Sequence, residues 1–279
     1  MTTFDIGDVR RYRSEYQVLA QVLGVPGARP APGEVEFLCE LIETRRPSFG
    51  MLPAPDILFA AALASILSPQ VVIEIGTASG FSAVVLAKMM ALRGQQADAM
   101  PNGTLVHTID SKAQYCEDPT KAVGFGIELL APELRDQIAV HPSQDSSYCR
   151  QLLRSGELML AFVDGNHRHP WPLLDVLQIQ RLMRSGWILM HDIDLPAHAE
   201  RARAACQPVD YVPSSGAKYV FDSWPGDKIS GGNIGAIKTP EGQRSLRDFV
   251  AKLRQLPPEV SAASWKKRWR DIDELAKEF

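Results

Sequence analysis

The run Val71–Gly80 constrains the fold of this chain more than any other stretch. Its first five residues, Val-Val-Ile-Glu-Ile, are typical of a buried strand, and an apolar helical pattern begins directly after the run. Gly76 allows the backbone to turn sharply, and Gly80 lets a ligand approach the main chain. The hydroxyls of Ser79 and Ser82 can satisfy free N–H groups of the new helix. The run therefore predicts a strand–turn–helix unit that opens a nucleotide-type site in an α/β fold.

The spacing of the glycines argues against a dinucleotide as the ligand. A dinucleotide fingerprint is Gly-x-Gly-x-x-Gly, whose N–H groups surround a pyrophosphate. Here Ala78 stands at the middle position, so the turn is Gly-x-x-x-Gly, and the acid Glu74 precedes it. A carboxylate beside the loop repels a pyrophosphate and attracts a ligand with an ammonium and a sulfonium group. Taken alone, the run is also compatible with an ordinary strand–helix turn in another α/β domain.

This turn resembles the first motif of the class I S-adenosylmethionine (SAM) methyltransferases, hydrophobic-x-Glu/Asp-x-Gly-x-x-x-Gly. The resemblance implies SAM as the cofactor and a set of residues around the turn that bind it: Glu74, Gly76, Thr77, Ser79, Gly80 and Ser82. It also implies a Rossmann-like, doubly wound α/β sheet of about seven strands with an antiparallel C-terminal hairpin. An NAD-dependent oxidoreductase is the less favoured alternative, because the dehydrogenase variant of the fold lacks that hairpin.

Acidic residues recur where the later predicted strands end. Asp110 ends a strand predicted over 104–110, Asp164 ends the apolar run 158–164, and Asp192 follows a strand predicted over 186–190. Ligands of an open α/β sheet bind beyond the carboxyl ends of its strands, so these acids and Glu74 are predicted to converge on one crevice. There Asp110 can hold both hydroxyls of a ribose, although a strand-end Asp that caps a turn is the alternative.

Two residues after the strand predicted over 137–141 complete the predicted donor site. The resemblance implies that an acid or a small polar residue here contacts the adenine amino group, and Asp145 and Ser146 are the matching residues. It also assigns Asp164 to the donor site. For Asp145, an N-cap of the next helix is the alternative.

Motifs after the later strands narrow the resemblance to one subgroup. They are Phe-Val-Asp-Gly-Asn-His (162–167), Gly-Trp-Ile-Leu-Met-His-Asp (186–192), Gly-Ala-Lys-Tyr-Val-Phe-Asp (216–222) and Asn-Ile-Gly-Ala-Ile (233–237). These strings are similar to small-molecule O-methyltransferases that include macrolide-sugar methyltransferases and cephalosporin-hydroxylase-like proteins. The subgroup implies methyl transfer to a hydroxyl of a small-molecule or natural-product acceptor. A SAM-binding protein of the same fold that is non-catalytic, or associated with a hydroxylase, is the alternative.

The same resemblance implies a catalytic pair and a cation site. Asp164 and His167 are the expected catalytic residues, because an imidazole can take the hydroxyl proton near neutral pH. A loop histidine that only hydrogen-bonds is the alternative for His167. Asp164, His191 and Asp192 match the ligands of a divalent cation, Mg²⁺ or Mn²⁺. Because Mg²⁺ prefers oxygen ligands, the imidazole of His191 shifts the expectation towards Mn²⁺, or His191 only forms a hydrogen bond.

Three segments are expected along the chain. Residues 1–54 form a helical cap or dimerisation segment, 55–240 the SAM-dependent methyltransferase domain, and 241–279 the C-terminal helices. The amphipathic N-terminal helices, predicted over 8–23 and 34–44, are compatible with a homodimer. Within the domain, 216–222 and 233–239 are predicted as the strands of the closing hairpin, and His169 and His198 as surface residues.

Composition excludes several other partners. The chain has 30 Lys and Arg against 33 Asp and Glu, a net charge of −3, so no overall positive field favours nucleic acid or an anionic membrane. The basic stretch Trp265–Arg270 is followed directly by acids and is predicted as a solvated helix face. The most apolar run, Ile57–Leu67, is too short to span a bilayer, and the first residues lack the pattern of a signal peptide. With four scattered cysteines read as free thiols, a cytoplasmic protein is expected.

Overall fold

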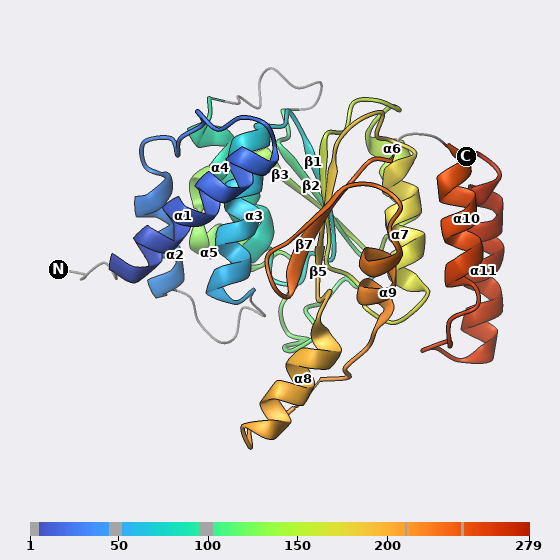
Figure 1. Ribbon diagram of the computed structural model, residues 1–279. Helices are drawn as coiled ribbons and strands as arrows, with labels where there is room; N and C mark the ends of the chain where they lie inside the picture. Colours follow the sequence, from blue (N-terminus) through green and yellow to red (C-terminus); the bar gives the residue numbers. More distant parts are fainter. Residues whose placement is uncertain (1–5, 45–51, 95–102, 210, 241–242) are drawn as a thin grey trace. The chain divides into compact units, whose positions relative to one another are not determined.

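The computed structural model describes residues 6–44, 52–94, 103–209, 211–240 and 243–279. By its internal contacts the chain divides into two compact units, residues 1–144 and residues 145–279. These are unit 1, from blue to green in Figure 1, and unit 2, from yellow-green to red.

Unit 1 contains parallel strands only. These are β1 (Val72–Ile75), β2 (Val106–Asp110) and β3 (Ile138–Pro142), in the order β3-β2-β1. Every residue of β1 is buried, which is the pattern of a parallel strand covered on both faces. The strands predicted over 104–110 and 137–141 therefore exist, with boundaries within two residues of those expected.

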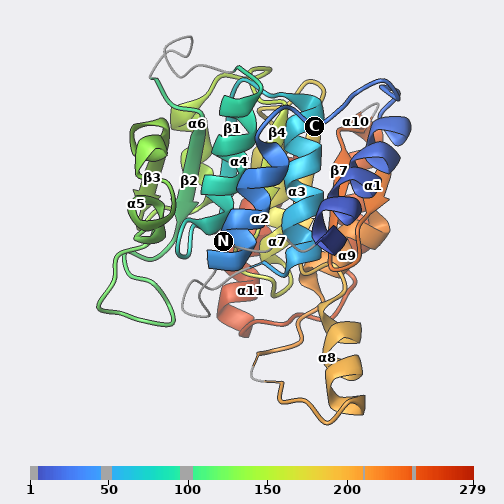
Figure 2. The same ribbon diagram turned by 90° about the vertical axis from the view of Figure 1, so that its left-hand side faces the viewer.

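Helices pack against these strands and bury an apolar core. They are α1 (Ile6–Val22), α2 (Glu34–Thr44), α3 (Ala54–Leu67), α4 (Phe81–Leu92) and α5 (Gly126–Leu130), with a 3-10 helix, η3, over Pro132–Gln137. α1 packs on α3, α3 packs on α4, and α4 lies against β2 and β3 (Figure 2). Glu34 is fully buried, accepts a hydrogen bond from the Tyr12 hydroxyl at 2.8 Å and forms an ion pair with Arg93 at 3.0 Å. This network ties α1 and α2 to the end of α4, so the N-terminal helices are packed parts of unit 1.

Unit 2 mixes parallel and antiparallel strands. β4 (Leu160–Val163) and β5 (Trp187–His191) are parallel, and β7 (Ile234–Lys238) pairs antiparallel with both β5 and the short strand β6 (Lys228–Ser230). The order in this unit is β4-β5-β7-β6. The described residues hold seven strands in all, flanked by helices, so the predicted α/β, Rossmann-like fold with an antiparallel C-terminal hairpin is confirmed.

One strand of the predicted hairpin is wrong. Residues 216–222 form the helix α9 (Gly216–Ser223), and β6 replaces them as the partner of β7. The buried side chains Ala217, Val220 and Phe221 have the i, i+3, i+4 spacing of a helix face. Their aromatic and β-branched character resembles a strand when the period is overlooked.

The other helices of unit 2 are α6 (Cys149–Leu152), α7 (Trp171–Gln180), α8 (Leu195–Ala204), α10 (Gln243–Leu253) and α11 (Ala262–Ala276), with a 3-10 helix, η4, over Ser146–Tyr148. α7 packs on α9 and α11. α10 also contacts α9 and α11. In both views α8 stands apart from the other helices of the unit. No helix in the described residues is long and apolar enough to cross a membrane.

The prediction that His169 is a surface residue is also wrong. Its side chain is fully buried, with Nε2 3.1 Å from the carbonyl oxygen of Leu253 and its ring against Trp265 and Trp269. In α11 the side chains of Lys266, Lys267 and Arg270 are exposed, whereas Arg268 is half-buried and Trp269 is buried in this contact. The aromatic residues of the basic stretch therefore serve packing, because they hold α11 against the loop that precedes α7.

Candidate active site

The turn after β1 has the backbone that its glycines predict. Gly76 and Gly80 have φ of 102° and 87°, and Ala78 between them has φ of 46°. The N–H of Gly80 donates to the carbonyl of Thr77 at 2.7 Å, which closes the turn immediately before α4. A Cβ at Gly80 would lie 2.6 Å from Cγ1 of Ile127, so this position lacks both the conformation and the room for a side chain.

Asp110 holds this turn from the end of β2. Its Oδ2 accepts a hydrogen bond from the N–H of Ala78 at 3.1 Å, and its Oδ1 accepts one from the N–H of Lys112 at 2.9 Å. The turn-capping role that was the alternative for Asp110 is therefore present. Each carboxylate oxygen has two lone pairs, so these bonds leave capacity for further donors such as ribose hydroxyls.

Glu74 and Asp110 lie on the same face of the unit 1 strands. The register pairs Glu74 with Thr108, and side chains alternate along a strand, so Asp110 shares a face with Thr108 and with Glu74. The Thr108 hydroxyl donates to Thr77 Oγ1 at 2.7 Å, which brings the turn over that face. Glu74, Thr77 and Ser79 are buried, whereas Ser82 and Asp110 are half-buried.

Asp145 and Ser146 make capping and interior contacts in unit 2. Asp145 Oδ1 accepts a hydrogen bond from the N–H of Ser147 at 3.0 Å, so Asp145 is the N-cap of η4. A capping role was the alternative to adenine binding for this residue. Ser146 is buried and hydrogen-bonds the carboxyl of Asp175, whose pKa burial raises to about 7. A contact of either residue with the adenine stays a prediction.

The ends of β4 and β5 bring together two carboxylates and an imidazole. Asp164 follows β4, Asp192 follows β5, and ligand atoms of Asp164, His167 and Asp192 all lie within 4.8 Å of one another. His167 Nε2 is 3.1 Å from Asp192 Oδ2 and 3.8 Å from Asp164 Oδ1. The side chains keep 13% to 26% of their surface exposed, so the cluster is accessible and partly desolvated.

Two neighbours hold the carboxylates of this cluster. His191 Nδ1 lies 3.0 Å from Asp164 Oδ1, and Asn233 Nδ2 donates to Asp192 Oδ1 at 2.7 Å. His191 thus makes a hydrogen-bonding contact, which was the alternative to its role as a metal ligand. The cluster of possible metal ligands consists of Asp164, Asp192 and His167. Asp192 also has φ of 59°, a left-handed conformation that is strained for a residue with a side chain and recurs at functional sites.

Sequence reasoning missed Asn233. It precedes β7, whose pairing places Ile234 opposite His191, so the antiparallel register brings Asn233 next to Asp192. In the sequence, Asn233 is recognisable only as the first residue of the strand predicted over 233–239. That position does not indicate that Asn233 contacts Asp192.

The chemistry of the cluster fits a divalent cation of the Mn²⁺ type better than Mg²⁺. Two carboxylates and one imidazole offer mixed oxygen and nitrogen ligands, which transition metals accept, whereas Mg²⁺ prefers oxygen alone. The hydrogen bonds from His191 and Asn233 use one oxygen of each carboxylate. Within the described part of the chain, Oδ2 of Asp164 makes no hydrogen bond or ion pair.

A family model of known proteins matches the part of the chain that contains the candidate residues. Residues 73–193 match a family model described as a methyltransferase domain. A search of curated proteins finds no match.

Solved structures of methyltransferases resemble the chain in fold. An SAH-bound methyltransferase of Podospora anserina is 15% identical, with 87% of this chain and 99% of that chain covered and a TM-score of 0.50. A putative O-methyltransferase of Klebsiella pneumoniae is 14% identical, with 82% and 99% covered and a TM-score of 0.48. An O-methyltransferase of tomaymycin synthesis from Streptomyces achromogenes, solved with SAM, is 16% identical, with 87% and 100% covered and a TM-score of 0.45. Residues 73–193, which contain the Gly-x-x-x-Gly turn and the cluster at the ends of β4 and β5, are therefore similar to a methyltransferase domain.

Proposed function

We propose that this protein transfers the methyl group of SAM to a hydroxyl of a small-molecule or natural-product acceptor. The observation that carries the proposal is the pair of His167 and Asp192 beside Asp164, at the carboxyl ends of β4 and β5. O-methylation needs a group that removes the hydroxyl proton, and an imidazole oriented by a carboxylate is suited to that task.

The proton step follows from the geometry of this pair. With its proton on Nε2, His167 donates to Asp192 Oδ2, and Nδ1 is left as an acceptor. The acceptor hydroxyl gives its proton to Nδ1 while its oxygen attacks the methyl carbon of SAM, and the sulfonium leaves as the neutral thioether of S-adenosylhomocysteine (SAH). Asp192 stabilises the imidazolium that forms, and Asn233 holds Asp192 in place.

The donor is assigned to the residues of the turn and of β2. Gly76 and Gly80 open the backbone to SAM, Asp110 binds the ribose hydroxyls, and Glu74 supplies negative charge for the positively charged donor. Thr77, Ser79 and Ser82 belong to the same set. Asp145, Ser146 and Asp164 stay predicted donor-site residues. The segment 55–240 is proposed as the whole catalytic domain.

A divalent cation is proposed as an addition to this chemistry. Asp164 and Asp192 would hold it, with His167 or His191 as the nitrogen ligand, and it would lower the pKa of a hydroxyl bound to it. If His167 serves as this ligand, it is not the base. Excess EDTA distinguishes the two roles, because full activity after EDTA treatment leaves His167 as the base.

Calorimetry with SAM, SAH and NAD tests the donor. We expect SAM and SAH to bind and NAD not to bind, and NAD binding without SAM binding would refute the proposal. Gly80→Ala tests the place of binding, because the added Cβ meets Ile127 inside the turn.

Release of SAH in the presence of panels of hydroxylated small molecules tests transfer. We expect His167→Ala and Asp164→Asn to slow turnover by about 100-fold or more. His198→Ala and Asp194→Asn are the controls, since these residues lie outside the cluster. If both site variants keep wild-type turnover, the assigned site is wrong. SAM binding without SAH release from any panel favours the non-catalytic alternative.

A further inference from the structure

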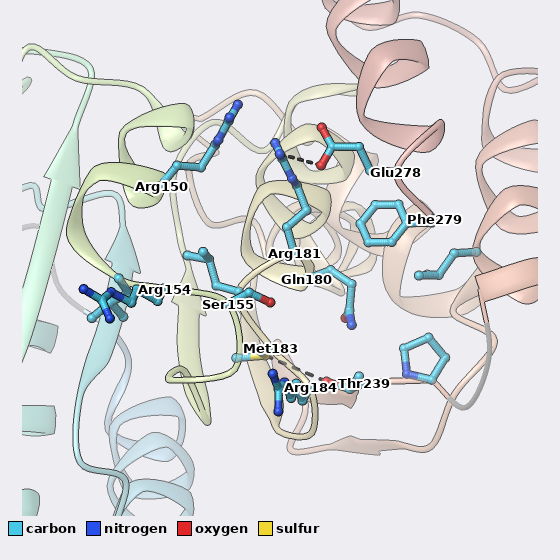
Figure 3. A pocket seen from close by; sticks show the side chains of 14 residues that line it. Arg150, Arg154, Ser155, Gln180, Arg181, Met183, Arg184, Thr239, Glu278 and Phe279 are labelled. Atoms are coloured by element: carbon cyan, nitrogen blue, oxygen red, sulfur yellow. Dashed lines mark hydrogen bonds and ion pairs between the residues drawn. The ribbon is translucent and has the colours of Figure 1, made fainter.

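A second charged site lies in unit 2, away from the residues proposed for methyl transfer. It is a cavity of about 770 Å³ whose lining includes four arginines, Arg150, Arg154, Arg181 and Arg184 (Figure 3). Its volume is within the range of about 300–1,000 Å³ that is usual for small-molecule sites. A group of four arginines is notable in a chain whose net charge is −3.

The cavity lies at the amino ends of the unit 2 strands. Arg154 and Ser155 precede β4, Arg184 precedes β5, and Thr239 follows the antiparallel strand β7. The proposed catalytic cluster lies at the carboxyl ends of β4 and β5. The length of β5 separates the two places, about 17 Å for a strand of this size. The cavity is therefore a distinct site.

The described residues that line the cavity include four arginines and a single acidic side chain, Glu278. Arg181 forms an ion pair with Glu278 at 2.5 Å, whereas Arg150, Arg154 and Arg184 form no ion pair with any residue that the structure describes. Burial lowers the pKa of Arg181 and the charge of Arg150 lowers it further, although Glu278 opposes both effects. Four cationic groups thus share one acidic side chain, so an anion of several charges is the complementary ligand.

One of these arginines lies close to the loop before β4. The side chain of Arg184 lies against Gly156, where an added Cβ would come within 2.8 Å of Nε. The N–H of Gly156 donates to the carbonyl of Leu182 at 2.7 Å, which ties the loop before β4 to the segment before β5. The loop backbone that Arg184 lies against is therefore fixed, and the side chain itself is exposed to a ligand.

Part of the lining is apolar and includes an aromatic ring. This part consists of Leu153, Leu182, Met183, Pro240, Leu246 and Phe279, of which Figure 3 labels Met183 and Phe279. Guanidinium groups bind phosphate oxygens in a bidentate manner, and an aromatic side chain offers a surface on which a planar ring can stack. A ligand with a phosphate chain at one end and an aromatic ring at the other matches both parts of the lining.

We propose that this cavity binds a nucleoside polyphosphate, with the phosphates on Arg150, Arg154 and Arg184 and the base against Phe279. The ligand class follows from the excess positive charge, the volume and the apolar wall. This site is independent of the methyl-transfer proposal, since it uses none of the same residues.

Calorimetry of the full chain with ATP tests the site, in the presence of saturating SAH so that adenine binding at the donor residues is blocked. We expect ATP to bind and the double variant Arg154→Gln/Arg184→Gln to weaken it by about tenfold or more, because each charge-assisted hydrogen bond contributes strongly. Arg203→Gln, on the exposed surface of α8, is the matched control and should leave the affinity unchanged. Affinity should also fall as salt rises.

Inorganic triphosphate and Phe279→Ala separate the two parts of the ligand. Phe279→Ala should weaken ATP and leave triphosphate unchanged, whereas the double arginine variant should weaken both. Absence of ATP binding, or equal ATP affinity in the wild type and the double arginine variant, would overturn the proposal. A thermal unfolding scan of each variant verifies that it is folded, and folding is expected because Arg154 and Arg184 are exposed.

Discussion

The candidate functional residues of the two units are groups of different kinds. In unit 1 the candidate donor residues form a feature of the main chain: a turn with three positive φ angles, closed by its own N–H groups and held by Asp110. In unit 2 the candidate catalytic residues are side chains alone, two carboxylates and an imidazole gathered from two strand ends. A turn of this kind depends on glycine spacing, whereas a side-chain cluster depends on register and rotamer.

The units also differ in the sign of their response to pH. Unit 1 buries the imidazole of His107, and unit 2 buries the carboxyl of Asp175. Burial disfavours the charged form in both cases, so it lowers the pKa of the base and raises the pKa of the acid. Acid should therefore weaken unit 1 through His107, and neutral to alkaline pH should weaken unit 2 through Asp175.

The largest effect is expected from Asp175→Asn. The pKa of Asp175 is raised from 3.8 to about 7, chiefly by burial, so the folded state binds the proton more tightly than the unfolded state. Stability then falls as pH rises from about 4 to 7, by up to about 4 kcal/mol at 1.4 kcal/mol per pKa unit. Asparagine removes this penalty, so the variant should be more stable than the wild type at pH 8 and less sensitive to pH.

Urea unfolding followed by tryptophan fluorescence measures this change, because all five tryptophans lie in residues 145–279. Asp222→Asn, on the exposed side of α9, is the matched control. An unchanged pH slope in Asp175→Asn would show that Asp175 is ionised in the folded protein.

The next effect is the acid response of unit 1. The pKa of His107 is lowered to about 4, first by burial and second by the charge of His141, whose Nε2 lies 3.1 Å from Nδ1 of His107. Because the unfolded state binds the proton more tightly, stability is lost as pH falls from about 6.5 to 4, by about 3 kcal/mol. His107→Gln should flatten this acid limb in unfolding curves followed by far-UV circular dichroism. His198→Gln, an exposed histidine, should keep it.

The fold was predictable where local pattern and tertiary structure agree. The glycine spacing of 76–80 and the apolar runs before Asp110 and Asp164 identified the turn and the parallel strands, since buried strands and tight turns leave strong local signals. The segment 216–222 was misread because its residues favour strands by type, while its i, i+3, i+4 burial, set by packing against α7, makes it helical.

The candidate site was predictable only as far as strand ends. Acids at 164 and 192 were placed together because parallel strands end at one edge. Which imidazole joins them depends on side-chain direction: His191 turns to Asp164 Oδ1, and His167 reaches Asp192 from the loop. The β5–β7 register brings Asn233 next to Asp192, and α10 and α11 bury His169. Both are contacts between residues far apart in the sequence, so no local pattern predicts them.

A smaller effect comes from comparing two glycines that flank α4. Gly80 and Gly94 have φ of 87° and 80°, but a Cβ at Gly80 meets Ile127 at 2.6 Å, whereas a Cβ at Gly94 meets nothing within 4 Å. Gly94→Ala should cost about 1–2 kcal/mol for the left-handed backbone alone. Gly80→Ala should cost about 1–3 kcal/mol more because of the added contact. Urea unfolding measures both, and equal costs would show that the turn has room for a side chain.

The smallest effect is expected at the hydrogen bond that orients Asp192. Asn233→Ala removes the donor to Asp192 Oδ1 and should lower the stability of unit 2 by about 1 kcal/mol. Because nothing else described in the cluster holds that oxygen except the longer contact with His191 at 3.5 Å, the carboxylate should also lose its fixed direction. Mn²⁺ binding, measured by electron paramagnetic resonance, should then weaken by about tenfold, as for other residues that orient metal ligands.

Asn166→Ala is the matched control for this change, since Asn166 accepts a hydrogen bond from the N–H of Arg168 in the same loop as His167 but does not contact Asp192. Weaker Mn²⁺ binding in Asn233→Ala alone would mean that the unit 2 cluster depends on side-chain orientation, in contrast to the backbone turn of unit 1. If both variants bind Mn²⁺ equally well, the loop and strand backbones position Asp192 without Asn233, and the two units would be alike in this respect.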